Sequence, residues 1–157
     1  MFLPLKGFRI LAVEQFGAGP YGSMYLADMG AEVIKIENKS SGGDAARNTG
    51  TKIGENDSTY FQAFNLNKKS VTLDLKSTEG KNIFKNLVTR SDVVWNNLRG
   101  NQAEKLGLDY ESLKTTNADI VCTHISAYGR KNDRADWPGY DYLMHAECGF
   151  LHLTGEP

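Results

Sequence analysis

The chain has 157 residues, a length that suits one domain with a buried core. Its 18 basic and 19 acidic residues leave a formal net charge of −1 without a long run of one sign, which argues against a nucleic-acid or membrane-surface protein. No stretch approaches about eighteen apolar residues, and the N-terminus does not resemble a signal peptide. Cys122 and Cys148 lack C-x-x-C spacing and are expected to be reduced, buried thiols of a cytoplasmic protein.

The chain begins with a predicted strand, helix and second strand. Apolar residues predict strands over 8–13 and 31–37, separated by a helix over 20–29 that follows a glycine-rich turn. Pro20 suits the first helical position, and Gly30 suits the end of the helix.

Residues 38–59 are polar and glycine-rich, which predicts a long loop with little regular structure. A loop of that length inside a compact domain is usually functional or mobile. Residues 60–65 then resemble an apolar turn segment, and residues 70–75 are predicted to form a third strand.

The later elements alternate between helix and strand. Ser77 is predicted to cap a helix that ends at Arg90, with an apolar face formed by Ile83, Phe84, Leu87 and Val88. Strands are predicted over 92–96 and 120–125, short helices over 103–106 and 110–116, and a further helix over 140–151. The alternation predicts an α/β fold in which a mainly parallel sheet is flanked by helices, with residues 1–157 in one domain.

The glycine turn Gly17-x-Gly19-x-x-Gly22 matches the fingerprint of dinucleotide-binding sites. It opens a helix whose N-terminal amides favour a phosphate, and Glu37 ends the next strand, where such sites hold a ribose hydroxyl. Pro20 removes one of those amides, and the bulky Phe16 and Tyr21 crowd the turn. The motif leaves two interpretations open, a non-catalytic NAD- or FAD-binding module and a tight connection between strand and helix.

The sequence carries no signature of metal or serine-hydrolase chemistry. His124, His145 and His152 lack Cys or carboxylate partners at useful spacing, so no metal site is predicted. A G-x-S-x-G nucleophile elbow does not occur.

A series of further motifs runs through the chain in order. They are Leu5-x-Gly7-x-x-Ile10-Leu11, Ala18-Gly19-Pro20, residues 26–37, Gly43-Asp44 with Arg47, residues 65–70, Leu73-Asp74-Leu75-Lys76, Glu79-Gly80, Asp92-Val93, Asn97-Leu98-Arg99 and Gly139-Tyr140-Asp141. Together they resemble the family III CoA-transferases (CaiB/BaiF type), which include formyl-CoA and succinyl-CoA transferases and have the α-methylacyl-CoA racemases as close relatives. The resemblance covers nearly the whole chain, so it is far more specific than the glycine motif alone.

The resemblance implies that the chain is the N-terminal portion of a Rossmann-like large domain whose groove holds coenzyme A (CoA) instead of a dinucleotide. In that family the residue after Glu37 is commonly an arginine that meets the nucleotide, and here it is Asn38. The resemblance implies that residues 16–18 line the groove through their backbone and that Leu73 and Lys76 flank the adenine and the ribose phosphate. It implies that Asn97, Leu98 and Lys105 lie along the pantetheine and the phosphates. The CoA-binding residues implied in this way are Phe16, Gly17, Ala18, Asn38, Leu73, Lys76, Asn97, Leu98 and Lys105.

The resemblance also implies a covalent route that moves CoA from an acyl-CoA to a carboxylic acid. An aspartate carboxylate attacks the thioester, and the mixed anhydride that results is converted by the CoA thiolate into an aspartyl-CoA thioester. In that family the aspartate lies about a dozen residues beyond the stretch that matches residues 154–157 here. The 157 residues are therefore expected to lack the nucleophile, the small domain and the return segment, and to be inactive alone.

Tyr140 and Asp141 match the family's Gly-Tyr-Asp motif near the active site, where they are expected to support catalysis by shaping the acyl pocket. Racemase relatives carry histidine at position 140, and the high pKa of tyrosine suits proton transfer poorly, so the transferase is favoured over the racemase. The expected partners are acyl-CoA and carboxylic acid substrates and a second copy in an interlocked homodimer. No metal, nucleic acid or membrane partner is expected.

Overall fold

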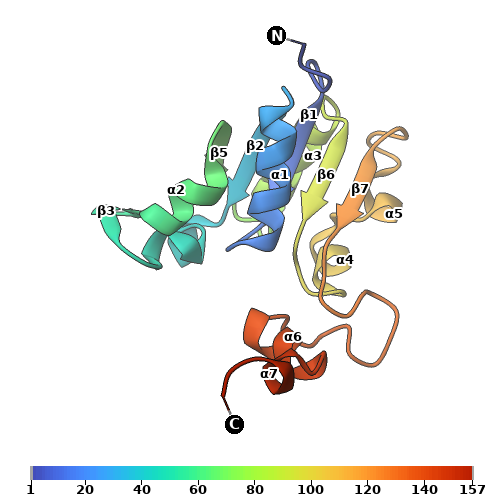
Figure 1. Cartoon of the computed structure of the whole chain (residues 1–157). Coiled ribbons are helices and arrows are strands. Elements are labelled where there is room, and N and C mark those ends of the chain that lie inside the picture. Colours follow the sequence, from blue (N-terminus) through green and yellow to red (C-terminus); the bar gives the residue numbers. More distant parts are fainter. Residues whose placement is uncertain (1, 157) are drawn as a thin grey trace.

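Five parallel strands form one sheet at the centre of the computed structural model, which describes residues 2–156 (Figure 1). In spatial order they are β5 (Lys68–Thr72), β2 (Glu32–Glu37), β1 (Arg9–Val13), β6 (Val93–Asn96) and β7 (Val121–His124). β1 pairs with β2 on one side and with β6 on the other, so Ile10 lies opposite both Val33 and Val93. The prediction of an α/β fold with a mainly parallel sheet is confirmed, and the strand order is typical of doubly wound sheets.

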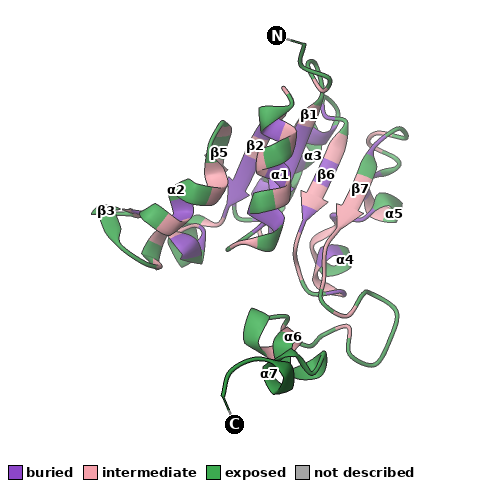
Figure 2. Ribbon diagram, viewed as in Figure 1, coloured by how far each residue is buried: buried purple, intermediate pink, exposed green. Residues whose placement is uncertain are grey.

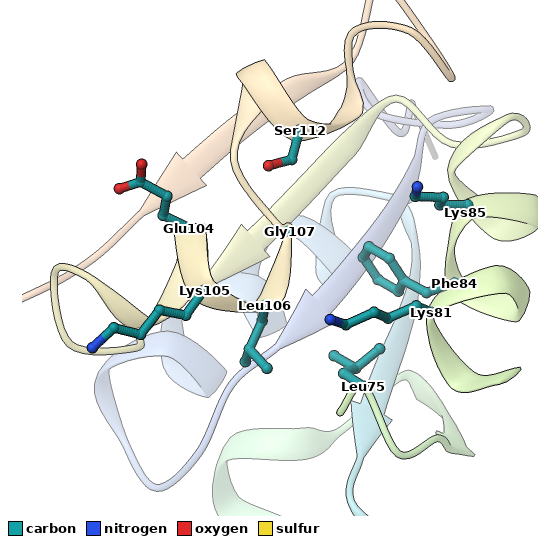
Figure 3. A pocket seen from close by; sticks show the side chains of 9 residues that line it. All are labelled: Leu75, Lys81, Phe84, Lys85, Glu104, Lys105, Leu106, Gly107 and Ser112. Carbon is teal, nitrogen blue, oxygen red and sulfur yellow. The ribbon is translucent and has the colours of Figure 1, made fainter. Parts of the chain in front are cut away.

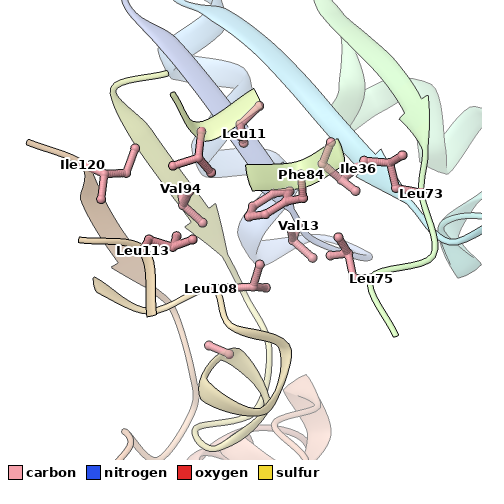
Figure 4. Close-up of a cluster of buried hydrophobic side chains, with 12 residues drawn as sticks. Leu11, Val13, Ile36, Leu73, Leu75, Phe84, Val94, Leu108, Leu113 and Ile120 are labelled. Carbon is pink, nitrogen blue, oxygen red and sulfur yellow. The ribbon is translucent and has the colours of Figure 1, made fainter. Parts of the chain in front are cut away.

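Helices cover both faces of this sheet because successive residues of a strand point to opposite sides. Ile10 and Ala12 pack on the face that carries α1. Leu11 and Val13 point to the opposite face, into the larger core cluster shared with α3, α4 and α5 (Figure 4). The helices are α1 (Ala18–Asp28), α3 (Thr78–Val88), α4 (Gln102–Leu106) and α5 (Tyr110–Leu113).

Helix α3 begins where the sequence predicts. The Ser77 hydroxyl accepts a hydrogen bond from the Gly80 amide at 2.9 Å, which satisfies one of the free donors of the first turn. Phe84 and Val88 are buried in the core, whereas Ile83 is 41% exposed. The predicted apolar face is therefore narrower than four residues.

Helix α1 begins earlier than predicted, at Ala18. Pro20 therefore lies inside the first turn and not at the first helical position, and the turn tolerates it because the first amides have no intrahelical acceptor. Gly30, with φ of +102°, follows the helix and lets the chain turn into β2.

Residues 38–59 are more regular than predicted. They contain two short 3-10 helices, η1 (Lys39–Ser41) and η2 (Ala45–Asn48), and a small hairpin of β3 (Lys52–Gly54) and β4 (Asp57–Ser58). The predicted apolar turn segment after them is a helix, α2 (Thr59–Asn65). The side chains of Asn38, Asp44 and Ser58 each cap one of these helices, so local side-chain hydrogen bonds order a segment that lacks apolar periodicity.

The third predicted strand is displaced toward the N-terminus. β5 covers Lys68–Thr72, and residues 73–75 leave the sheet edge with Leu73 and Leu75 buried in the core. The Leu73 amide still donates to the Glu37 carbonyl at 2.9 Å, which holds this segment beside the end of β2.

The predicted helix over 140–151 is divided into α6 (Asp141–Glu147) and α7 (Phe150–Leu153), because Gly149 adopts a φ of +71°. Both helices lie beyond the carboxyl ends of the strands (Figure 1), and most of their surface is exposed (Figure 2). Cys148 is exposed, so the prediction of a buried thiol is wrong there, whereas burial raises the pKa of the half-buried Cys122 to about 11. Each helix in residues 2–156 is too short or too polar to span a bilayer.

Candidate functional site

Two adjoining clefts lie at the carboxyl ends of β1, β2 and β6, the edge of the sheet at which α/β proteins bind ligands. The first, called here the β2 cleft, has a volume of about 280 Å³ between the ends of β1 and β2 and the segment after β5. The second, the turn cleft, has a volume of about 460 Å³ between the turn after β1, the segment after β6 and the start of α6. Gln15 and Leu98 line both clefts, so the two are neighbours.

The two clefts bring together every predicted site residue except Lys105. The β2 cleft contains Asn38, Leu73, Lys76 and Leu98. The turn cleft contains Phe16, Gly17, Ala18, Asn97, Leu98, Tyr140 and Asp141. The parallel topology explains this grouping, because residues that follow different strands meet at one edge of the sheet.

The turn between β1 and α1, residues 14–18, forms the wall shared by the clefts and is called here the first turn. Asn97 holds it from the side of β6: its Oδ1 accepts from the Gln15 amide at 2.9 Å, and its Nδ2 donates to the Gln15 carbonyl at 2.8 Å. Both polar side-chain atoms of Asn97, which is predicted to contact the ligand, thus form hydrogen bonds with the protein backbone. Phe16 follows with a φ of +61°, a left-handed conformation that is uncommon for a residue with a Cβ.

The glycines of the fingerprint motif allow close packing of α1. A Cβ on Gly19 would lie 2.7 Å from Cγ of Asn97, and a Cβ on Gly22 would lie 2.6 Å from Cζ2 of Trp95. The Trp95 indole also donates to the Gly19 carbonyl at 3.1 Å, which fixes the ring against the helix. These glycines therefore serve the tight strand-to-helix connection.

Glu37 does not provide the free acid that the dinucleotide interpretation requires. It receives four donors: Arg47 through two nitrogens, at 2.8 and 2.7 Å, the Ser70 hydroxyl at 2.6 Å and the Asp44 amide at 2.9 Å. Burial alone would raise the pKa of Glu37, but the hydrogen bonds from Arg47, Ser70 and Asp44 outweigh it and lower the pKa to about 2. A carboxylate has about four acceptor positions, and here the protein uses all of them.

Four charged side chains are buried between the first turn and the sheet, and they are called here the charge cluster: Glu14, Lys35, Asp44 and Lys68. Lys35 Nζ lies 2.8 Å from Asp44 Oδ2 and 3.7 Å from Glu14 Oε1, and Lys68 Nζ lies 2.9 Å from that same Glu14 oxygen. Each side chain is at most 2% exposed, and two acids balance two bases. Sequence reasoning missed this cluster, although a lysine inside a buried parallel strand is a signal that an acid lies nearby.

Lys105 lies in a separate cleft of about 390 Å³ between α3 and α4 (Figure 3). Figure 3 shows its side chain directed away from Lys81 and Lys85 on α3. This cleft shares Leu75 and Leu106 with the β2 cleft, so Lys105 is a neighbour of the predicted site but does not line it.

The sequence model of CoA-transferase family III matches residues 5–157. The chain belongs to CoA-transferase family III.

Relatives within family III include the succinate–glutarate CoA-transferase of Agrobacterium fabrum, which is 41% identical over 98% of this chain and 40% of its own length. The α subunit of the succinyl-CoA–L-malate CoA-transferase of Chloroflexus aurantiacus is 38% identical over 99% of this chain and 36% of its own length. The crystal structure of a CaiB/BaiF family protein from Brucella suis superposes with a TM-score of 0.88 at 36% identity, covering all of this chain and 42% of that one. The chain thus spans about 40% of the length of the relatives it matches.

The Gly-Tyr-Asp motif of this family III chain lies at the start of α6, on the outer wall of the turn cleft. Tyr140 is 48% exposed and stacks on Tyr142 with ring centroids 5.8 Å apart, and Asp141 occupies the first turn of the helix. Within residues 2–156, no three His, Cys, Asp or Glu side chains are grouped so that they could hold a metal ion.

Proposed function

We propose that the chain is the CoA-binding portion of an enzyme that moves CoA between an acyl-CoA and a carboxylic acid. The observation that carries this proposal is the pair of neighbouring clefts at the carboxyl ends of β1, β2 and β6, which gather ten of the eleven implied site residues in a chain of CoA-transferase family III. CoA is a long molecule with a nucleotide at one end and a thiol at the other. Two adjoining clefts can hold the two ends of such a ligand better than one compact pocket can.

The β2 cleft is proposed to hold the nucleotide end. Leu73 provides an apolar surface for the adenine, and the exposed ammonium of Lys76 provides a cation for a phosphate. Asn38 lies where family members commonly carry an arginine. Asn38 is uncharged, and its Oδ1 caps η1 by accepting from the Ser40 amide at 3.0 Å. Lys76 is therefore expected to supply the positive charge in this cleft.

The turn cleft is proposed to hold the pantetheine and the thioester. Leu98 lies where the two clefts join, and the first turn leads to α1, which begins at Ala18. The first amides of a helix have no intrahelical acceptor and stabilise negative charge. They would therefore favour the oxyanion or the thiolate that develops when a thioester in this cleft is attacked.

The nucleophile is proposed to be an aspartate carboxylate supplied by chain outside these 157 residues. Its oxygen bonds to the acyl carbon as the C–S bond breaks, which gives a mixed anhydride and CoA thiolate. The thiolate then attacks the aspartyl carbonyl carbon, which releases the donor acid and leaves an aspartyl-CoA thioester. The acceptor carboxylate repeats the two steps in reverse and departs as the new acyl-CoA.

Tyr140 and Asp141 are proposed to shape the acyl end of the turn cleft. Tyrosine at position 140 supports the transferase over a racemase, because a racemase requires a proton-transfer base there.

The 157 residues alone are proposed to be inactive as a transferase. The active form is proposed to be a homodimer of the longer chain, as the resemblance implies.

Isothermal titration calorimetry of the purified chain with CoA, acetyl-CoA and NAD tests the proposal. We expect CoA and acetyl-CoA to bind with similar affinity, because the nucleotide and pantetheine contacts are common to both, and NAD to bind more weakly or not at all. Tighter binding of NAD than of CoA would overturn the proposal.

A further inference from the structure

The first turn is held at its backbone by side chains from several elements. Lys35 donates to the Glu14 carbonyl at 3.3 Å, and Lys68 donates to the Pro20 carbonyl, just after the turn, at 2.8 Å. Asp44 accepts from the Phe16 amide at 3.1 Å. The charge cluster is therefore more than a balanced set of buried ions, because Lys35 and Asp44 hold the wall that the two clefts share. Lys68 holds the first turn of α1, which follows that wall.

Asp44 is the member that also belongs to the other cleft. Its carboxylate accepts from the amides of Phe16 and Ala46 through Oδ1 and pairs with Lys35 through Oδ2. Its own amide donates to Glu37 Oε2 at 2.9 Å, and it lines the β2 cleft together with Gly43. One buried residue thus connects the 38–48 segment, at the nucleotide end, with the first turn, at the thioester end.

The contact to Phe16 has a specific conformational consequence. In residues 2–156, Phe16 and Asn67 are the non-glycine residues with positive φ. A residue with a Cβ adopts this conformation only where its surroundings impose it. The buried Asp44 carboxylate is the acceptor that the Phe16 amide finds in this conformation, so it holds Phe16, and after it Gly17 and Ala18, against the turn cleft.

We propose that Asp44 is a positioning residue that couples the two clefts: it shapes the first turn for the pantetheine and thioester from its place in the wall of the nucleotide end. This inference rests on the proposed function, because it assumes that the clefts hold the two halves of CoA. Asp44 is not expected to touch the reacting atoms.

The test compares three ligands: CoA, its nucleotide half adenosine 3′,5′-bisphosphate, and its other half pantetheine. Asp44→Ala removes the acceptor of the Phe16 amide, and we expect it to weaken CoA and pantetheine about tenfold while adenosine 3′,5′-bisphosphate changes less than about twofold. Asp44→Asn keeps an oxygen for the Phe16 amide but loses the charge that pairs with Lys35, so we expect it to be less stable than the unsubstituted chain. In the folded Asp44→Asn protein we expect the ratio of the CoA and bisphosphate affinities to stay within about threefold of that of the unsubstituted chain. Asp119→Ala, at an exposed site outside both clefts, is the matched control.

The ratio of the CoA and bisphosphate affinities is the deciding quantity, because a general loss of folded protein lowers both in proportion. An unchanged ratio in Asp44→Ala overturns the inference, and a ratio in Asp44→Asn that is shifted as far as in Asp44→Ala overturns it as well. If the unsubstituted chain binds no CoA, the proposed function fails first and the inference fails with it.

Hydrogen exchange of the unsubstituted chain provides a measurement that needs no variant. The amides of Phe16 and Ala46 share Asp44 Oδ1 as acceptor, so we expect both to be protected. If Asp44→Ala does not fold, exchange of the Phe16 amide at the rate of an open loop would overturn the inference.

Discussion

Gly22 of α1 lies against the six-membered ring of Trp95 on β6, so closely that a Cβ at position 22 would be 2.6 Å from the Trp95 Cζ2. Trp95 cannot move away without cost, since its indole nitrogen donates to the Gly19 carbonyl. The last glycine of the fingerprint motif is thus a packing residue that brings α1 onto the sheet and places the start of the helix at the turn cleft.

Gly22→Ala is therefore expected to destabilise the chain by about 1–3 kcal/mol, the usual cost of adding a methyl group to a well-packed site. Urea unfolding followed by circular dichroism measures the change. Gly54→Ala is the matched control, because a Cβ there would meet Asp57 Cβ at an ordinary 3.7 Å and φ is not positive. Equal stability of the two variants would contradict the packing role.

The hydrogen bonds of Glu37 predict a loss of stability in acid. Its pKa of about 2 in the folded chain lies below the ordinary 4.5, so the stabilisation is fully present above about pH 4.5 and is lost as the pH falls toward 2. The difference corresponds to about 3 kcal/mol, an order-of-magnitude value. Urea unfolding at pH 7, 4 and 3 tests it.

Glu37→Gln is expected to be less stable than the unsubstituted chain at pH 7 and to lose less stability between pH 5 and 3. The exposed Glu55→Gln serves as control and is expected to leave the pH dependence unchanged. A pH profile of Glu37→Gln that is parallel to that of the unsubstituted chain would show that Glu37 is not the responsible group.

The sequence was sufficient to predict the sheet, because its strands are short apolar runs between helices with clear caps, such as the one at Ser77. It was insufficient for α2, which is too short to show a helical period, and for the segment before it, which side-chain caps such as Asn38 and Asp44 order. Local capping hydrogen bonds are weak individually, and their geometry depends on tertiary contacts.

For the site, motif positions predicted which residues meet at the sheet edge but not what their side chains do. Asn97 was predicted to contact the ligand, yet its amide group engages the backbone of Gln15. Lys35 inside a buried strand indicates that an acid lies nearby, but nothing local identifies Glu14 as the partner of Lys35 and Lys68. The pairing exists only once separate strands are brought together. Long-range pairing of this kind follows from the topology and not from spacing along the chain.

Lys35→Met is expected to destabilise the chain by about 3–5 kcal/mol, because it leaves the buried carboxylate of Asp44 without its cation. Thermal and urea unfolding measure the change. Lys114→Met removes a lysine whose partner Glu111 is exposed, and such surface pairs contribute about 0–1 kcal/mol. A loss for Lys35→Met as small as that of the control would mean that the charge cluster does not stabilise the fold.

Lys76→Ala is expected to weaken CoA binding about tenfold, or about 1.4 kcal/mol, because the variant removes the cation proposed to meet a phosphate in the β2 cleft. Calorimetry at two salt concentrations measures the change. Salt screens the attraction between Lys76 and a phosphate, so the affinity of the unsubstituted chain should depend more on salt than that of the variant.

Lys131→Ala removes another exposed lysine, which lies outside both clefts, and is the control. It is expected to bind CoA like the unsubstituted chain. If Lys76→Ala and Lys131→Ala bind CoA equally well with the same salt dependence, the phosphate does not lie at Lys76. Alanine variants of Lys39, which follows Asn38, and of the lysines in the adjoining cleft, Lys81, Lys85 and Lys105, would then show whether a shifted nucleotide meets another lysine.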